Sequence, residues 1–318
     1  MPSAGGDGGD KPERPANKPV PRAADKPVAA EKAIAAGVPK SPDIPKAPPW
    51  WKTLRADPPV HIRMLFGIAM IAALVALWYV VTAGEPVERI ISPARLPSPG
   101  EVFGSLFGGK APFVDQEPTF FENIAASLQR VFLGVMLATL VGVGLGIVAA
   151  AQRGVAAALA PIVIFLRSIP MGAFAMVTLL LFSLGERQKT MFIFFAVVAF
   201  VFSDTVKAIA SVPERYIETA QTLGASRIQI VRKVLVPLAL PDIVTSLRFQ
   251  FGLALGYIML AEELDTPRGI GRLLQVSLQK SLYDHIYLIL FLIAVIAFGI
   301  DLVLRTIQRG MFPWRRDL

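Results

Sequence analysis

The chain has 318 residues, of which 54% are hydrophobic, and its mean hydropathy of +0.55 is high for a water-soluble protein of that length. The absence of cysteine excludes disulfides and thiolate metal sites, and the two histidines, His61 and His285, lie far apart. No nucleophile–base pair or metal-ligand cluster can be assembled. The net charge of +8 resides mostly in the terminal segments rather than on a basic face. Composition therefore favours an integral membrane protein over an enzyme, a metalloprotein or a nucleic-acid-binding protein.

Residues 1–61 differ in composition from the rest of the chain. They contain 13 of the 26 prolines and many lysines, with almost no large apolar residue before Trp50. Such a segment cannot bury enough apolar surface to fold, so a disordered cytosolic tail is predicted. The tail lacks the apolar run of a cleavable signal peptide, and its positive charge suits contact with anionic membrane lipid.

Six segments are apolar enough to cross a bilayer, whose hydrocarbon core of about 30 Å requires roughly 20 residues per helix. Two of them contain no charge, and each of the other four contains one. The segments are Met64–Gly84, Val131–Ala151, Gly154–Gly185 around Arg167, Thr190–Val206 around Asp204, Ile243–Ala261 around Arg248 and Ile286–Leu304 around Asp301. An all-α polytopic fold with about six transmembrane helices is predicted for residues 62–318, or five if the short fourth segment packs against protein.

Lysines and arginines are distributed asymmetrically around these segments. Eleven lie in the tail up to Arg63 and four arginines follow the last span, whereas the loop Glu85–Glu122 has three basic residues against six acids. Basic loops stay in the cytosol, so both termini and residues 208–237 are expected there, and loop 85–122 is expected outside. Within that loop, Ser98, Pro99 and Glu101 predict the start of a short helix.

The external loop also contains a sequence similar to a phosphate-binding loop. Residues Gly104–Lys110 fit the pattern G-x4-G-K, but Ala111 stands where a serine or threonine would hold magnesium. No apolar strand precedes this sequence, and the predicted topology places it away from cytosolic ATP. The chain is therefore not expected to bind a nucleotide cofactor itself.

Small residues recur at every fourth position along the second span. Gly134, Ala138, Gly142 and Gly146 share one face of a helix and would let a neighbouring helix approach closely. We interpret this stripe as a packing surface.

A polar unit, Ser211–Pro237, interrupts the apolar segments. It contains two pairs with the spacing of capping boxes, Ser211 with Glu214 and Ser226 with Gln229. Gly224 suits the left-handed residue that ends a helix, and Pro237 is expected to end the second helix. The pattern predicts two short helices joined at Gly224, exposed on the cytosolic side.

Within this unit, Glu218-Thr219-Ala220 is followed after three residues by Gly224 and, after nine more, by Val234-Leu235-Val236-Pro237. The pattern resembles the E-A-A-x3-G-x9-I-x-L-P motif of the inner-membrane permeases of ATP-binding cassette (ABC) importers, with Thr219 in place of an alanine. The resemblance implies that Glu218, Ala220, Gly224 and Pro237 belong to the element that couples the permease to its ATPase.

The resemblance covers about residues 62–316 and implies a multi-pass permease of the bacterial inner membrane that translocates a small anionic or polar solute. Two permease copies, or one copy and a sister chain, would enclose the path. Two separate ATPase subunits, which bind ATP and magnesium, would dock on the cytosolic helices, and an extracytoplasmic binding protein would deliver the solute. The alternative is an ATP-independent channel or secondary transporter, which would predict inverted repeats with interrupted helices in both halves.

The segment Phe165–Pro170 resembles the L-R-x-I-P segment of the nitrate, taurine and aliphatic-sulfonate branch of these permeases. This resemblance places Arg167, Ser168 and Pro170 in a candidate substrate path. Ionisable residues within spans face a cavity, a partner or another charge, so a structural ion pair of Arg167 with Asp204 or Asp301 is the equal alternative.

Other charges lie near the ends of the predicted spans. Arg248 and Asp301 are close to the cytosolic side, and both are expected to anchor at the membrane interface by snorkelling. Glu262 and Glu263 follow the fifth span and resemble the external acidic position of the same permease branch.

Overall fold

The computed structural model describes residues 57–85, 89–107, 119–264 and 266–315. Most of the predicted tail and the end of the Gly104–Lys110 sequence lie outside these residues. The chain divides into two compact units, residues 1–68 and 69–318. Every regular element in the described residues is a helix, as predicted. The elements are α2 (Val60–Val81), α3 (Pro99–Phe107), α4 (Phe120–Ala151), α5 (Arg153–Ser168), α6 (Met171–Phe182), α7 (Glu186–Ala210), α8 (Glu214–Thr222), α9 (Arg227–Ile230), the π-helical η2 (Val231–Leu235), α10 (Val236–Glu262), α11 (Ile270–Gln279) and α12 (Tyr283–Met311).

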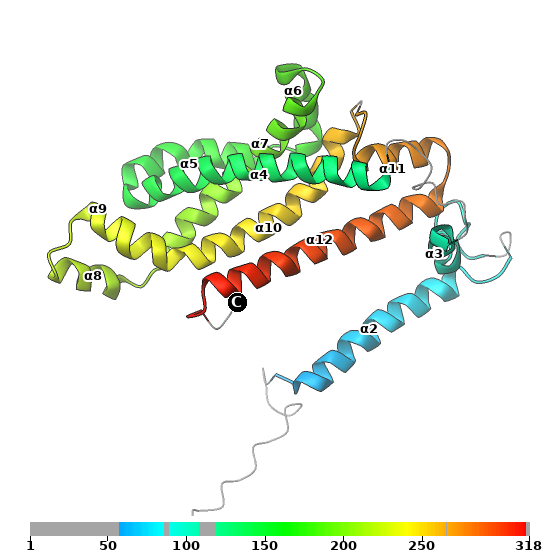
Figure 1. Ribbon diagram of the computed structural model, residues 1–318, viewed down its shortest axis with the longest axis horizontal. Coiled ribbons are helices and arrows are strands. Elements are labelled where there is room, and N and C mark those ends of the chain that lie inside the picture. The colour runs from blue at the N-terminus through cyan, green and yellow to red at the C-terminus, as the bar shows by residue number, and fades with distance from the viewer. Residues whose placement is uncertain (1–56, 86–88, 108–118, 265, 316–318) are drawn as a thin grey trace, which may run out of the picture. The chain divides into compact units, whose positions relative to one another are not determined.

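Long helices of the second unit pack side by side. Helices α4, α7 and α10 contact one another, and α12 packs along α10 (Figure 1). The core shared by α4, α7 and α10 contains apolar side chains from all three helices, including Val131, Val135, Phe192, Ile193, Val197, Leu255 and Ile258. Large apolar side chains of α4 and α10 are exposed as well, so this core is held by close van der Waals packing between the helices and not by one-sided amphipathicity.

By length and composition, α2, α4, α7 and α12 qualify as membrane spans, and the pair α5–α6 would be a fifth. The predicted span 154–185 is not one straight helix, because α5 and α6 are bent by 105°. Ile169 and Pro170 have extended backbone at the bend, as expected for a proline and the residue before it. The predicted segment Ile243–Ala261 lies in α10, whose 27 residues extend for ~40 Å. Helix α10 does not qualify by the same criteria, so the described residues contain four or five candidate spans where about six were predicted.

The predicted small-residue stripe of α4 is confirmed as a packing surface. A Cβ atom added to Gly134, Gly142 or Gly146 would lie 2.6, 2.9 or 2.7 Å from a side-chain atom of α7. Ala138, on the same face, is fully buried. The two helices approach closely only because these positions carry almost no side chain.

The short helix predicted in the loop after the first span is confirmed as α3. Ser98 Oγ accepts a hydrogen bond from the Glu101 N–H at 3.3 Å, and Glu101 accepts one from the Ser98 N–H at 2.7 Å. Burial opposes the charge of Glu101, but the Ser98 amide and the Arg89 guanidinium outweigh it and lower the pKa of this carboxyl. Trp78 Nε1 donates to Pro97 O at 3.0 Å, which ties the end of α2 to this segment.

Candidate functional site

The polar unit folds into a hairpin of two short helices, α8 and α9, next to the ends of α7 and α10 (Figure 1). We call residues 211–237 the α8–α9 hairpin. The Gly224 N–H donates to Gln221 O at 2.9 Å, and the Ala225 N–H reaches back across the turn to Ala220 O at 3.0 Å. These bonds define a Schellman motif, and Gly224 has the left-handed φ of +77° that the motif requires. The prediction that Gly224 ends the first helix is confirmed.

The two predicted capping boxes have different outcomes. Ser226 and Gln229 exchange both hydrogen bonds, at 2.8 and 3.4 Å, so α9 starts as predicted. The prediction for Ser211 is wrong, because Ser211 ends α7 and its hydroxyl donates to Ala208 O at 2.8 Å. Serine readily bonds to a carbonyl in the preceding turn, and α8 then begins after Pro213 without a side-chain cap.

The prediction that Pro237 ends the second helix is also wrong. The chain stays helical from Arg227 to Glu262 and passes through the π-helical turn η2 into α10. The Val236 N–H donates to Val231 O, five residues earlier, immediately before Pro237. Since Pro237 has no N–H to place, the wider turn lets the helix continue past it.

The four residues of the predicted coupling motif occupy different positions in the hairpin. Glu218, Gly224 and Pro237 are exposed, whereas Ala220 is buried. Ala220 belongs to an apolar cluster that joins the hairpin to α7 and α10, formed by Ala208, Ile209, Ala220, Ile230, Leu235, Ala239 and Ile243. Because of this shared core, the hairpin is a packed extension of two long helices and not a free loop.

Two large apolar residues at the tip of the hairpin were missed by the sequence reasoning. Leu223 is 81% exposed and Ile228 is 70% exposed, on either side of Gly224. Single exposed apolar side chains are common, but these two flank the same turn, five residues apart in sequence. The sequence signal that could have revealed this exposed pair was Leu223 itself, a leucine directly before Gly224 at the position where α8 ends.

The candidate substrate-path residues lie at the bend between α5 and α6. Arg167 is exposed, and its Cζ atom lies 4.7 Å from the ring centroid of Phe200 in α7. This distance is that of a cation–π contact. Ser168 donates to a carbonyl of the preceding turn at 2.8 Å, and Pro170 precedes the first residue of α6. The structure therefore brings the three residues together at one break in the helix.

Asp204, one turn beyond Phe200 in α7, faces α10. Its Oδ2 atom accepts hydrogen bonds from Ser246 Oγ at 2.8 Å and from Gln250 Nε2 at 3.2 Å. Among the described residues no ion pair joins Arg167 to Asp204, so this form of the structural alternative is wrong.

Arg248 and Asp301 are partners in an ion pair between α10 and α12. Arg248 Nη2 donates to Asp301 Oδ1 at 2.8 Å, and Arg248 Nη1 donates to Gln308 Oε1, also at 2.8 Å. The two charges meet because α10 and α12 pack together. Their placement at the membrane interface stays a prediction. The alternative pairing of Asp301 with Arg167 is excluded by the same contact.

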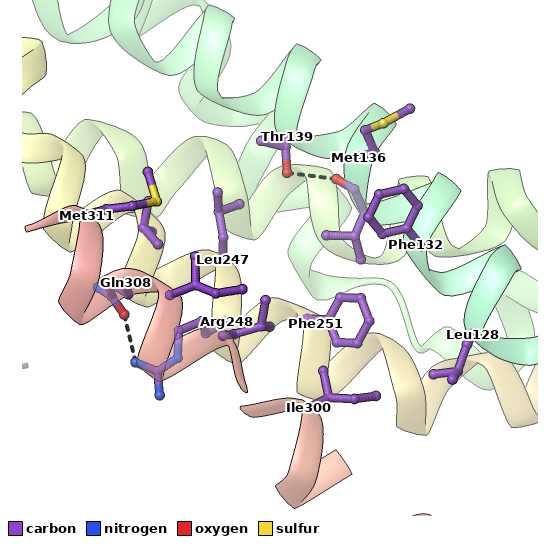
Figure 2. A pocket seen from close by; sticks show the side chains of 14 residues that line it. Leu128, Phe132, Met136, Thr139, Leu247, Arg248, Phe251, Ile300, Gln308 and Met311 are labelled. Atoms are coloured by element: carbon purple, nitrogen blue, oxygen red, sulfur yellow. Dashed lines mark hydrogen bonds between the residues drawn. The ribbon is translucent and has the colours of Figure 1, made fainter. Parts of the chain in front are cut away.

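An apolar groove of about 520 Å³ lies beside this ion pair, between α4, α10 and α12 (Figure 2). Its lining includes Phe132, Met136, Leu247, Phe251, Ile300 and Met311, with Arg248 and Gln308 at one side. Arg167, Ser168 and Pro170 do not line this groove. A groove of this composition suits an apolar chain and not a small polar solute.

A buried charged cluster joins the ends of α7 and α10 to α4. Arg130 is 3% exposed and binds both carboxylate oxygens of Glu186, at 2.5 and 2.6 Å. It also donates to Glu262 Oε1 at 2.6 Å. Glu262 is fully buried and accepts two further bonds, from Ser127 Oγ at 2.6 Å and from the Gly271 N–H at 2.9 Å.

Sequence reasoning gave Glu262 and Glu263 one common role, but the structure separates them. Glu263 is exposed, whereas Glu262 is neutralised inside the protein by Arg130, which lies 132 residues earlier in the chain. The only local signal for this ion pair was Arg130 itself, which stands directly before the long apolar run of α4.

A bundle of membrane-spanning helices with a charged helical hairpin packed against two of them has the architecture of a transport permease that works with a separate energy-supplying subunit. The family model described as "Binding-protein-dependent transport system inner membrane component" matches residues 142–317, and the chain belongs to this family. The protein is therefore the inner-membrane permease of a binding-protein-dependent ABC importer and not its catalytic subunit. An ATP-independent channel or secondary transporter is ruled out, and an ATPase and a binding protein are implied as partners.

Several relatives support this assignment. The chain is 32% identical over 260 residues to the taurine transport system permease protein TauC of Escherichia coli, covering 82% of this chain and 93% of that one. It is 29% identical over 247 residues to the nitrate import permease protein NrtB of a Synechocystis strain, covering 76% and 87%. The predicted resemblance to the nitrate, taurine and sulfonate branch is confirmed.

Solved structures share the fold. An inward-facing structure of the MetNI methionine ABC transporter aligns with a TM-score of 0.55 at 21% identity, covering 61% of this chain and 98% of that chain. A bacterial alginate ABC transporter in complex with its periplasmic protein aligns with a TM-score of 0.51 at 19% identity, covering 79% and 96%. The helical arrangement is therefore that of an ABC-importer permease.

Proposed function

We propose that two copies of this permease enclose one translocation path, with both termini and the α8–α9 hairpins in the cytosol. Each hairpin docks on one of two ATPase subunits, and an extracytoplasmic binding protein delivers the solute from the other side. The orientation is supported by the eleven basic residues of the tail and the four arginines after the last span.

The observation that carries this proposal is the packing of the hairpin. Its exposed residues, among them Glu218 in α8 and Leu223 and Ile228 around the turn, are joined through buried Ala220 to the ends of α7 and α10. When the ATPases close on ATP and draw the two hairpins together, a packed connection of this kind moves the long helices with them. A flexible loop would absorb the same motion.

The proposed solute is a small molecule with an acidic group. The relatives named for taurine, nitrate and aliphatic sulfonates support this class. Arg167 supports it also, because an exposed guanidinium at a helix break can bind an anion. Mass spectrometry of the ligand retained by the cognate binding protein tests the class: a sulfonate, carboxylate or inorganic anion is expected, and a sugar or a cation would contradict it.

Gly224→Val is expected to uncouple ATP hydrolysis from transport. A β-branched residue at a φ of +77° costs about 1–2 kcal/mol because its Cβ meets the following carbonyl oxygen. The space around Gly224 is open, so the strain is conformational and should shift the angle between α8 and α9 without unfolding the bundle. Solute uptake by cells that express the complete importer provides the measurement.

Gly224→Asn is the matched control, since asparagine tolerates the left-handed conformation. It is expected to retain most of the uptake at an equal amount of permease in the membrane. Wild-type uptake by Gly224→Val would show that the conformation of this turn is not needed for coupling.

Glu218→Lys is expected to weaken the association of the permease with its ATPase. Glu218 is exposed and forms no ion pair among the described residues, so reversing its charge should cost the permease fold about 0–1 kcal/mol. Co-purification of the ATPase with tagged permease measures the effect.

Glu214→Lys makes the same charge reversal one turn earlier on α8 and serves as the control. A specific contact predicts a larger loss of ATPase for the change at Glu218. Equal losses would point to the overall charge of α8, and undiminished co-purification of the Glu218 variant would contradict the proposed contact.

A further inference from the structure

We propose that helix α6 joins two copies of the permease through an exposed apolar surface made of Met176, Val177, Leu180 and Leu181. We call these four residues the α6 face. The inference rests on the proposed pairing of two copies, and it goes further because it assigns the surface that the copies share. Two identical copies related by a two-fold axis contribute the same surface to their contact, so the α6 face of one copy meets the α6 face of the other.

Helix α6 is directed away from the helices on either side of it in the chain. It contains 12 residues and is bent by 105° from α5, and Figure 1 shows it standing out from the bundle that includes α4, α5 and α7. A helix of 12 residues rises only ~18 Å, whereas the hydrocarbon core of a bilayer is about 30 Å thick. Helix α6 is therefore too short to cross the membrane by itself.

One side of α6 is fixed to α7. Thr178 is fully buried, and its Oγ1 atom accepts a hydrogen bond from Gln188 Nε2 at 3.1 Å. The ring centroids of Phe174 and Phe182 lie 5.7 and 6.4 Å from that of Phe195. Because a buried polar contact and aromatic packing hold this side, α6 keeps its position and does not fold back over its own bundle.

The other side of α6 is left exposed by the described residues. Leu180 is 85% exposed, Leu181 66%, Met176 53% and Val177 44%. Residues spaced i, i+1, i+4 and i+5 share one side of a helix, so these four form a continuous surface. At about 100 Å² each they offer on the order of 400 Å² of apolar area, about half of the ~800 Å² that each partner buries in a standard interface.

Lipid alone is a poor cover for this helix. A helix that lies in the membrane interface has a polar face, whereas the only polar side chain of α6 is Thr178, which is buried against α7. Within hydrocarbon the ends of α6 would lack hydrogen-bond partners, because its first turn has no side-chain cap and non-helical backbone flanks it at Pro170 and Ser183. Such backbone is tolerated at membrane depth where protein covers it or where it lines a water-filled cavity.

A second copy supplies both the protein cover and the cavity. Helix α6 begins directly after the candidate substrate-path residues Arg167, Ser168 and Pro170. A path that two copies enclose has a wall from each of them, so the helix that starts at this wall is placed to meet its mate. The apolar groove between α4, α10 and α12 is the competing surface for a second copy, and no residue of the α6 face lines it.

Cross-linking of single cysteines in membranes that contain the complete importer tests this proposal, since the native chain has no cysteine. A short bifunctional thiol reagent is expected to shift Val177→Cys and Leu180→Cys from monomer to covalent dimer on a denaturing gel. Leu140→Cys in α4 and Leu302→Cys in α12 are matched controls, because these leucines are 67% and 53% exposed on other helices. Both controls are expected to stay monomeric. Solute uptake before cross-linking confirms that each variant is folded.

Co-purification of two differently tagged wild-type copies separates this proposal from the pairing on which it rests. If the tagged copies co-purify but the α6 cysteines stay monomeric like the controls, lipid or another chain covers α6 and the α6 face is wrong. A covalent dimer at Met136→Cys, which lies in the apolar groove, and not at Leu180→Cys would assign the contact to the groove instead. If the tagged copies do not co-purify, the pairing of two identical copies is itself wrong.

Discussion

Glu262→Ala is expected to destabilise the permease by about 3–5 kcal/mol, the cost of removing one partner from a buried ion pair. The substitution removes a carboxylate partner from the buried guanidinium of Arg130, a residue that is only 3% exposed. It also deprives the Ser127 hydroxyl and the Gly271 amide of their acceptor. The loss should appear as a lower midpoint of thermal unfolding for the purified permease in detergent.

Glu186→Ala is the matched control, because Glu186 is the second carboxylate bound to the same arginine. Its side chain is 64% exposed, so water can replace it at Arg130. A loss of at most about 1 kcal/mol is expected, as for surface ion pairs. If both variants unfold at the same temperature, burial of Glu262 does not govern the strength of this cluster.

Gly134→Val is expected to separate α4 from α7 and to destabilise the bundle by about 1–3 kcal/mol or more, as overpacking of a close-packed core does. The added Cβ would lie 2.6 Å from Ile193 Cβ and 2.9 Å from the Thr190 carbonyl oxygen. Neither atom is the end of a flexible side chain, so relief requires a shift of the helix backbone. Thermal unfolding and gel filtration of the purified permease measure the effect.

Gly144→Val introduces the same side chain into the same helix, at a position with no neighbouring atom within 4 Å of the added Cβ. It carries the same change in helix propensity, so the difference between the two variants isolates the contact with α7. Comparable stability of both variants would show that the close approach of the two helices is dispensable.

The α8–α9 hairpin shows which structural features a local sequence pattern can predict and which it cannot. Gly224 and the pair Ser226–Gln229 were predicted correctly because their hydrogen bonds join residues within one turn of the chain. Ser211 and Pro237 were predicted wrongly because each position admits two local solutions. The packing of the hairpin on α7 and α10 selected the one that the pattern did not favour.

The sequence by itself therefore determined the class of fold, the stripe of small residues on α4 and the membership of the permease family. Each of these depends on periodicity, composition or spacing along a continuous stretch. Tertiary structure alone decided which charges meet. Arg130 reaches Glu262 over 132 residues, Arg248 reaches Asp301 over 53, and Ser246 reaches Asp204 over 42. Such pairs are invisible in the sequence because an isolated charge within an apolar run looks the same whether its partner is solvent, a solute or a distant residue brought close by helix packing.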